Sequence, residues 1–594
     1  MHQTQNSQLA AETLYNRVHL WLIVFRGMLP PQSNTGYRQF VYQLLGLGVC
    51  IFCLLGCSQE ISPIPPSPQT QEIPIQVTIQ PLEIDTACAG RFIPHQLDHT
   101  TIASTKNVAL YESNGSGVGI NDLDNDGDLD IVLANLGDVN QILWNEGHLR
   151  FRSQPLTHGQ SRAVTIVDVD GDGWQDIVFT RRLQKPTLWL NTRQGSENHF
   201  IQQDLPDVNH PFYTLDWVDL DNDGDLDFVA GSYDTELSKQ QGAIFDYRGG
   251  GVGVFVYTRQ NGTYLSQRLA DEADALAIAL PDLNQDGRPD ILVGNDFGRP
   301  DYIWEQSETG WVETTPFSSM TENTMSFDVG DVNNDGSAEI FATDMKPYRQ
   351  DKQTVETWQP LMEMMAHPPV DGDPQVVENV LQIRGADGQF INQAAGKIES
   401  ATGWSWSSKF GDLNNDGFLD IYVVNGMIAE EMLPHLPNYE LVERNQALRN
   451  DGLGNFVPAP EWGLGSTASG RGMSMADLDN DGDLDVVINN LMSPALLFEN
   501  QLCQGASLTV DLRWRGNKNP FAIGAKLSLH SEDEAYHRAI GASSGYLSGD
   551  PSQVHFGVPQ NTTLRKLIIQ WTDGNVSTVE TPTLNTNMRI SRQD

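Results

Sequence analysis

Seven short acidic loops hold the residue types and spacings in this chain that are best suited to chemistry. Each follows the pattern Asp-x-Asp-x-Asp-Gly-x-x-Asp, with Asn at position 3 in three copies and Glu at position 9 in one. Oxygen side chains at positions 1, 3, 5 and 9 around a glycine turn can enclose one hard cation, and Ca²⁺ prefers six to eight oxygen ligands. Position 7 varies from Asp to Trp, Arg, Ser and Phe, so we expect its backbone carbonyl to be the ligand there.

The pattern therefore predicts up to seven Ca²⁺ sites. The loops with Asn at position 3 carry one charge fewer, and we expect them to be the weaker sites. The predicted ligands of the first four loops are Asp122, Asp124, Asp126 and Asp130; Asp168, Asp170, Asp172 and Asp176; Asp219, Asp221, Asp223 and Asp227; and Asp282, Asn284, Asp286 and Asp290. Those of the last three are Asp331, Asn333, Asp335 and Glu339; Asp412, Asn414, Asp416 and Asp420; and Asp477, Asp479, Asp481 and Asp485.

The EF-hand begins with the same residues and is the main alternative for these loops. It requires a bidentate Glu at position 12 and a helix on each side. Position 12 is never acidic in this chain, because it is occupied by Leu133, Phe179, Ala230, Val293, Ala342, Val423 and Ile488. Each loop instead continues into a short β-branched apolar run, which indicates a buried strand. The repeated unit is thus predicted to be a strand, a calcium loop and a second strand.

The loops begin at intervals of 46 to 81 residues, a spacing that is typical of solenoids, propellers or arrays. A second element lies between them: an apolar strand, a polar turn and then an aromatic residue, as in residues 141–151 and 445–456. This hairpin and the two strands around the loop give four strands per repeat, which is a propeller blade. We predict an all-β fold in which residues 88–504 form a seven-bladed β-propeller. On these motifs the chain resembles the FG-GAP repeat family, the calcium-loop blades of integrin alpha chains.

The charge balance argues against nucleic acid as a partner. The chain has 36 Lys and Arg against 78 Asp and Glu, a net charge of −42, whereas nucleic-acid-binding surfaces are basic. Clustered carboxylates repel one another without a metal, so we expect the metal-free blades to be looser.

The N-terminal region resembles an export signal. Residues 41–55 are apolar and too short to span a bilayer comfortably, but they fit the core of a signal peptide. They lead into Gly56-Cys57-Ser58, which resembles the bacterial lipoprotein signal, where cleavage precedes the cysteine and the thiol carries lipid. We expect a signal peptide over residues 1–56 (Met28 is an alternative start), a lipid anchor at Cys57 and a Pro-rich tether over residues 57–87. The expected location is extracytoplasmic, as an outer-membrane lipoprotein or a secreted protein; an ordinary secretory signal and an uncleaved anchor are the alternatives.

Residues 505–594 contain no calcium loop. They form short strand-like segments separated by turn residues, which predicts a small β-sandwich. Residues 519–529, 545–558 and 567–574 resemble the ASPIC and UnbV domain, which follows FG-GAP blades in the cartilage acidic protein family and its bacterial relatives. That family usually has Trp-Pro-x-Gly where this chain has Trp571-Thr572-Asp573-Gly574. The resemblance implies a secreted or surface calcium-binding protein.

Cys88 and Cys503 lie where the predicted ring has to close. The seventh loop is followed by only the first strand of its hairpin, residues 494–500, and residues 89–99 resemble the missing outer strand. Both cysteines flank the turn at which these strands would meet. We predict a disulfide there, with Cα atoms within about 7 Å. Two unpaired buried thiols are the alternative.

Two classes of function are consistent with these features. The sequence has no HExxH or P-loop motif, and a catalytic metal keeps an open position beside a base or nucleophile. We expect a non-catalytic binding or adhesion module for a protein or glycan ligand at the cell surface. The alternative is an extracytoplasmic enzyme, a polysaccharide lyase or hydrolase, that uses the central channel of the propeller.

Overall fold

The computed structural model describes residues 71–83, 88–103, 107–192, 200–241, 251–365, 374–398 and 400–593. The expected signal peptide (residues 1–56), the lipidation site Cys57 and much of the expected tether lie outside the described residues. Within the described ranges, no helix has the length and hydropathy needed to cross a membrane.

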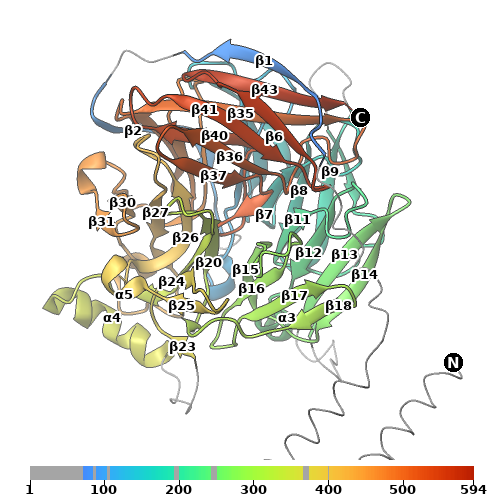
Figure 1. Cartoon of the computed structure of the whole chain (residues 1–594). Coiled ribbons are helices and arrows are strands. Elements are labelled where there is room, and N and C mark those ends of the chain that lie inside the picture. The colour runs from blue at the N-terminus through green and yellow to red at the C-terminus, as the bar shows by residue number, and fades with distance from the viewer. Residues whose placement is uncertain are drawn as a thin grey trace, which may run out of the picture. The chain divides into compact units, whose positions relative to one another are not determined.

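Most of the described chain forms seven sheets that each have a core of four antiparallel strands, and short extra strands extend two of these sheets. Figure 1 shows their arrangement. In each sheet the first strand is innermost, and an acidic loop joins it to the second strand. Each sheet is one propeller blade, and we number the blades in chain order.

The strands of blades 1 to 4 are β3 (Val118–Asn121), β4 (Asp130–Leu133), β5 (Val139–Asn145) and β6 (Phe151–His158); β7 (Ser161–Val167), β8 (Asp176–Arg181), β9 (Gln184–Asn191) and β10 (Phe200–Asp204); β11 (Thr214–Val218), β12 (Asp227–Gly231), β13 (Val254–Gln260) and β14 (Thr263–Ala270); and β15 (Ala275–Ala279), β16 (Ile291–Asn295), β17 (Tyr302–Ser307) and β18 (Gly310–Glu313). Those of blades 5 to 7 are β20 (Ser326–Gly330), β21 (Glu339–Thr343), β24 (Val380–Arg384) and β25 (Phe390–Asn392); β26 (Gly403–Gly411), β27 (Asp420–Asn425), β30 (Gln446–Asn450) and β31 (Phe456–Pro458); and β32 (Gly470–Ala476), β33 (Asp485–Asn490), β34 (Pro494–Gln501) and β2 (Arg91–Thr100).

The blades form a closed ring. The innermost strands contact one another in the order β3, β7, β11, β15, β20, β26 and β32, and β32 contacts β3 again. Adjacent blades pack face to face through hydrophobic clusters, one of which joins Val118 and Ile131 of blade 1 to Val487 and Leu497 of blade 7. Because both faces of each sheet are covered, strands such as β4 and β12 are buried along their whole length. The prediction of an all-β propeller is confirmed.

The ring closes by combining the two ends of the propeller sequence in blade 7. Strand β2 pairs antiparallel with β34, from Arg91 opposite Gln501 to Thr100 opposite Pro494. Just beyond one end of this pair, Cys88 and Cys503 form a disulfide with Cα atoms 5.7 Å apart. This Cα separation lies within the limit of about 7 Å that was predicted for a disulfide.

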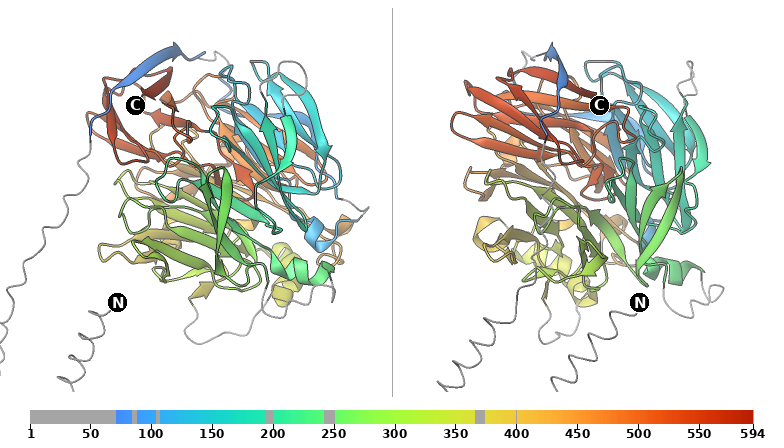
Figure 2. Two further views of the ribbon diagram at one scale, coloured as in Figure 1. Left: turned by 90° about the vertical axis from the view of Figure 1, so that its right-hand side faces the viewer. Right: turned by 45° about the vertical axis from the view of Figure 1, so that its right-hand side comes forward.

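After blade 7 the chain forms a β-sandwich of two four-stranded sheets, with strand orders β1-β43-β35-β40 and β37-β36-β41-β42. One hydrophobic cluster contains Leu508 and Leu527 from the two sheets together with Val167 and Phe228 of blades 2 and 3. The sandwich therefore shares a core with the propeller, and Figure 2 shows its strands packed beside those of the blades. Its strands are β1 (Ile75–Pro81), β35 (Ala506–Arg515), β36 (Lys526–Ser531), β37 (Ala535–Ala539), β40 (Gln553–Val558), β41 (Leu564–Gln570), β42 (Val576–Glu580) and β43 (Thr586–Gln593).

The prediction of a tether through residue 87 was wrong for Ile75–Pro81. These residues form β1, which pairs antiparallel with β43 as an edge strand of the sandwich. The backbone N–H of Ile73 also donates to the carbonyl of Val576 at 2.7 Å. Residues 75–80 alternate apolar and polar side chains, which is the period of a half-buried strand. The nearby prolines obscured that pattern.

The two longer helices lie at the face of the ring opposite the sandwich (Figure 1). Helix α3 (Asp234–Gln241) and helix α4 (Lys352–Met365) connect the second and third strands of blades 3 and 5, and α5 (Ala394–Lys397) follows β25. Helix α4 buries Trp358 and Leu361 against the propeller. Short strands are also present: β22 (Met345–Lys346) beside β26, and the pairs β19 (Met320–Thr321) with β23 (Gln375–Val376) and β28 (Met427–Ile428) with β29 (Glu440–Leu441).

Candidate metal centres

All seven acidic loops have the same internal hydrogen bonds. The N–H of the glycine at position 6 donates to the carboxylate at position 1 over 2.6–3.2 Å in every copy. The N–H at position 7 donates to the carboxylate at position 5 over 2.8–3.1 Å. Position 4 has a left-handed backbone in every copy, supplied by Asn, Gln or Gly, the first and last of which adopt it readily. These bonds turn the acidic side chains toward the inside of the loop.

The carboxylate at position 9 has a second role beside the predicted one. One of its oxygens accepts the N–H of position 2 over 2.8–3.1 Å in all seven loops. In six of them the other oxygen accepts an N–H from the third strand of the same blade over 2.7–2.9 Å. Position 9 therefore closes the loop and fixes it to the blade, and it can serve a metal only through its remaining lone pairs.

Three carboxylates converge in four of the loops, with ligand atoms within 4.8 Å of one another. These groups are Asp122, Asp124 and Asp126; Asp168, Asp170 and Asp176; Asp219, Asp221 and Asp227; and Asp477, Asp479 and Asp481. The other three loops have the Asn at position 3. In these four loops the structure brings together three of the four side chains that the sequence selected as ligands.

Buried oxygens without a hydrogen-bond partner test whether these loops suit a cation. The first-position Oδ1 atoms of Asp122, Asp219, Asp282 and Asp477 have no partner, and neither does Oδ1 of Asn414 at position 3 of the sixth loop. An unpaired buried acceptor costs about 1–3 kcal/mol. A hard cation inside the loop would satisfy these oxygens, so the donor set fits Ca²⁺.

Burial also makes the loop carboxylates difficult to ionise together. It raises the pKa of Asp122 and of Asp168 to about 7. In the seventh loop, burial followed by repulsion from Asp479 and Asp483 raises the pKa of Asp481 to about 9. A bound cation would reverse this preference by stabilising the charged forms.

Amide side chains that the sequence analysis did not identify connect the loops of neighbouring blades. Asn191 Nδ2 of blade 2 donates to the position-2 carbonyl of Leu123 in blade 1 at 2.8 Å and to Gln175 O in its own loop at 3.2 Å. The same arrangement recurs around the ring, with Asn145, Asn450 and Asn500 linking two loops each and Gln306 donating to the preceding loop. Their signal was the recurrent amide at the end of the third strand, as in the segments Trp144-Asn145 and Glu499-Asn500.

Comparisons with known proteins agree with these blades and loops. The FG-GAP-like repeat model matches residues 122–179, 168–230, 282–342 and 439–488, which include all the acidic loops except the sixth. The ASPIC and UnbV model matches residues 515–594. This chain is an FG-GAP repeat protein with an ASPIC and UnbV domain.

Two curated proteins and two solved structures are similar to the chain. The chain is 22% identical over 540 residues to cartilage acidic protein 1 of Xenopus tropicalis, covering 81% of this chain and 74% of the relative. It is 23% identical over 521 residues to cartilage acidic protein 1 of Mus musculus, covering 78% and 72%. Two crystal structures of BBS1N in complex with ARL6DN, soaked with mercury or lead, match at TM-scores of 0.36 and 0.38 with 9% and 8% identity. They cover 69% and 70% of this chain and 96% and 98% of those chains.

The ASPIC and UnbV domain rests on the face of the propeller that holds the acidic loops. Lys526 Nζ lies 2.8 Å from Oδ2 of Asp282, the first-position acid of loop 4. Lys518 Nζ lies 2.8 Å from Asp225 in loop 3. His555 Nε2 lies 3.0 Å from the carbonyl of Gly482 in loop 7, and burial lowers the pKa of His555 to about 4, so it is neutral there. Basic side chains thus approach loops 3 and 4, while loop 7 meets a neutral imidazole.

A short hairpin of this domain, β38 (Ser543–Ser544) and β39 (Ser548–Gly549), enters the centre of the propeller. Strand β39 pairs with the inner strand β3, with Gly119 opposite Gly549. The side chain of Tyr546 is fully buried, and its hydroxyl lies 2.5 Å from that of Tyr213. Further hydrogen bonds join the hairpin to the inner strands at Val164, Phe327, Ser407 and Met473. We call residues 543–550 the plug.

Ionisable groups surround the base of the plug. Lys409 forms an ion pair with Asp550 and a hydrogen bond with Ser544 at 2.7 Å. Burial raises the pKa of Asp216 to about 7, although its Oδ1 accepts the hydroxyl of Ser543 at 2.7 Å. Burial likewise raises the pKa of Asp328 to about 7. Side chains of blades 3, 5 and 6 are therefore charged or polar where the plug enters.

Proposed function

We propose that this protein is a calcium-binding, non-catalytic binding module that presents its propeller to a protein or glycan ligand outside the cell. The FG-GAP repeats and the likeness to cartilage acidic protein 1 support the extracellular location. The converging acids and their unpaired buried oxygens support Ca²⁺ as the cofactor. In this proposal Ca²⁺ stiffens the ring of loops, and the blades supply the binding surface.

The position of the plug favours the binding module over the enzyme alternative. A lyase or hydrolase acting in the central channel needs that channel for its substrate. Here residues 543–550 bond to the inner strands of blades 1, 2, 3, 5, 6 and 7. The channel entrance on the loop face is thereby occupied by the chain itself, which leaves the blade sides and the opposite face for ligands.

A glycan array and a pull-down from cell-envelope extract, each with and without Ca²⁺, test the function. We expect one or more ligands to be retained in Ca²⁺ and released by chelator, with no change in the ligand's covalent structure. Release of unsaturated or reducing sugar ends from a polysaccharide would instead establish the enzyme. Absence of any retained ligand in both assays would refute the binding module.

The lipid anchor at Cys57 is a separate part of the proposal. Replacing the residue, Cys57→Ala, removes the only thiol in the expected cleavage motif. We expect the variant to keep the mass of the uncleaved precursor, with the apolar residues 41–55 still attached. A variant with the same mass as the natural protein would exclude the lipoprotein signal and favour an ordinary secretory signal or an uncleaved anchor.

A further inference from the structure

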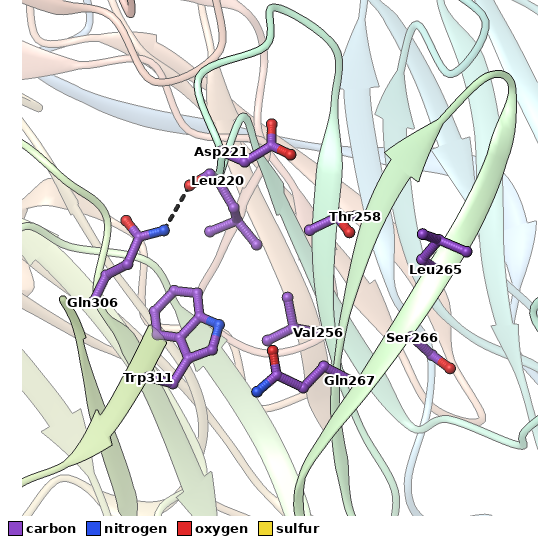
Figure 3. A pocket seen from close by; sticks show the side chains of 9 residues that line it. All are labelled: Leu220, Asp221, Val256, Thr258, Leu265, Ser266, Gln267, Gln306 and Trp311. Carbon is purple, nitrogen blue, oxygen red and sulfur yellow. Dashed lines mark hydrogen bonds between the residues drawn. The ribbon is translucent and has the colours of Figure 1, made fainter. Parts of the chain in front are cut away.

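A small pocket opens between the outer strands of blades 3 and 4 (Figure 3). Its volume is about 160 Å³. This space is too small for a helix or a folded peptide, and it suits one ring-sized chemical group.

The pocket combines an apolar surface with a polar edge. Val256 and Leu220 are buried and apolar, and the half-buried indole of Trp311 lies beside them. The exposed amide of Gln267 lies near the indole, and the carboxylate of Asp221 lies at the other end of the pocket (Figure 3). Ligand pockets typically have such an apolar lining with a few polar groups that fix orientation.

From this arrangement we propose that the pocket binds one ring of a neutral or amino sugar, which rests on the proposed binding function and names its ligand class. A sugar ring has an apolar C–H face, which an indole can cover, and hydroxyl groups at its edge, which the amide of Gln267 can bind. An acidic sugar is disfavoured by the net charge of −42.

The pocket is also connected to a candidate metal loop. Leu220 and Asp221 are positions 2 and 3 of loop 3, and Gln306 Nε2 holds the carbonyl of Leu220 at 2.7 Å. An ordered loop 3 therefore forms part of the pocket wall. Sugar binding at this place should be stronger with Ca²⁺ than with chelator.

Ligand-observed NMR by saturation transfer tests the inference on the full chain. The probes are glucose, galactose, mannose, N-acetylglucosamine and glucosamine at millimolar concentration in Ca²⁺, with glucuronic acid as the acidic comparison. We expect signal from one or more of the first five, little from glucuronic acid, and at least a fivefold loss in Trp311→Ala and in Gln267→Leu.

Blade 2 supplies matched controls. Trp189 of β9 and Gln202 of β10 are cross-strand neighbours, so Trp189→Ala and Gln202→Leu repeat both changes away from the pocket and should leave the signal intact. Gln267 is exposed, so Gln267→Leu decides the matter if Trp311→Ala fails to fold. No signal from any probe, or signal that persists in Gln267→Leu and Trp311→Ala, would overturn the sugar pocket. If ligand capture in the envelope assay survives these variants, the proposed function stands without it.

Discussion

Lys526 and Asp282 join the two domains at a predicted metal ligand, with Nζ 2.8 Å from Oδ2. Asp282 is the first position of loop 4, which also has Asn at position 3 and an ion pair between Arg288 and Asp286 at position 5. Basic side chains of the protein thus form ion pairs with two of the four predicted ligands, Asp282 and Asp286. Loop 4 is the place in the described ring where the chain itself competes most directly with a metal.

Replacing Lys526 should strengthen calcium binding at loop 4. The pair is half exposed, so its worth is about 0–1 kcal/mol, which corresponds to an increase in affinity of up to about fivefold. Calcium titrations followed by calorimetry compare Lys526→Ala with Lys566→Ala, a control on the neighbouring strand β41. An unchanged weakest site in Lys526→Ala would show that the pair does not compete with the metal.

Chelation should lower the melting temperature markedly. Extracellular sites of this type bind Ca²⁺ at about 10⁻⁴ to 10⁻³ M, and a ligand that binds only the native state raises stability by mass action. Mg²⁺ should restore little, because it requires a smaller octahedral site. Differential scanning fluorimetry at several Ca²⁺ concentrations measures the effect. A melting temperature that does not change with chelator would show that the loops do not bind Ca²⁺ in the folded protein.

Asp216 should make stability depend on pH. Burial raises its pKa to about 7, with Asp550 and Lys409 as the nearest charged groups. The folded state therefore holds a proton that the unfolded chain releases near pH 4, and stability is lost as pH rises from about 4 through about 7. Both hydrogen bonds of Asp216 go to Oδ1, so Asp216→Asn can keep them.

The variant Asp216→Asn should match the natural protein at pH 4 and melt higher at pH 8. Saturating Ca²⁺ in both samples keeps the loop carboxylates from titrating. Equal melting temperatures at pH 8 would mean that Asp216 is ionised in the folded protein at no cost.

The disulfide should stabilise the closure of the ring. Cys88 and Cys503 are separated by 415 residues, and loop-closure entropy gives a bond of this kind up to about 5 kcal/mol. Reduction, or the double change Cys88→Ala with Cys503→Ala, should lower the melting temperature in Ca²⁺. Because β2 and β34 remain paired without the bond, we expect destabilisation rather than loss of fold. If a reductant leaves the melting temperature unchanged, the pairing of β2 with β34 alone holds the ring closed.

The sequence was informative where short patterns decide the structure. The acidic loops, the β-branched runs after them and the split hairpin with Cys88 and Cys503 all follow from local residue types. The docking of the ASPIC and UnbV domain could not be predicted in this way. Lys526 meets Asp282 across 244 residues, and nothing in either local sequence specifies the partner. Similarly, residues 543–550 read as a turn-rich segment, and their role as a plug depends on the shape of the finished ring.

Removing the tyrosine of the plug should loosen the two domains from each other. Tyr546 is fully buried, with its ring 5.1 Å from that of Trp406 and its hydroxyl against Tyr213. Truncation of a buried aromatic costs about 3–5 kcal/mol, so Tyr546→Ala should melt well below the natural protein and be cleaved faster by protease near residue 505. Tyr546→Phe removes the hydrogen bond with the Tyr213 hydroxyl and should cost about 1–3 kcal/mol. Tyr302→Ala, on the third strand of blade 4 (β17), is the control for loss of a half-buried tyrosine. If Tyr546→Ala behaves like this control in melting and proteolysis, the plug does not hold the domain on the propeller, and the channel is open to ligands after all.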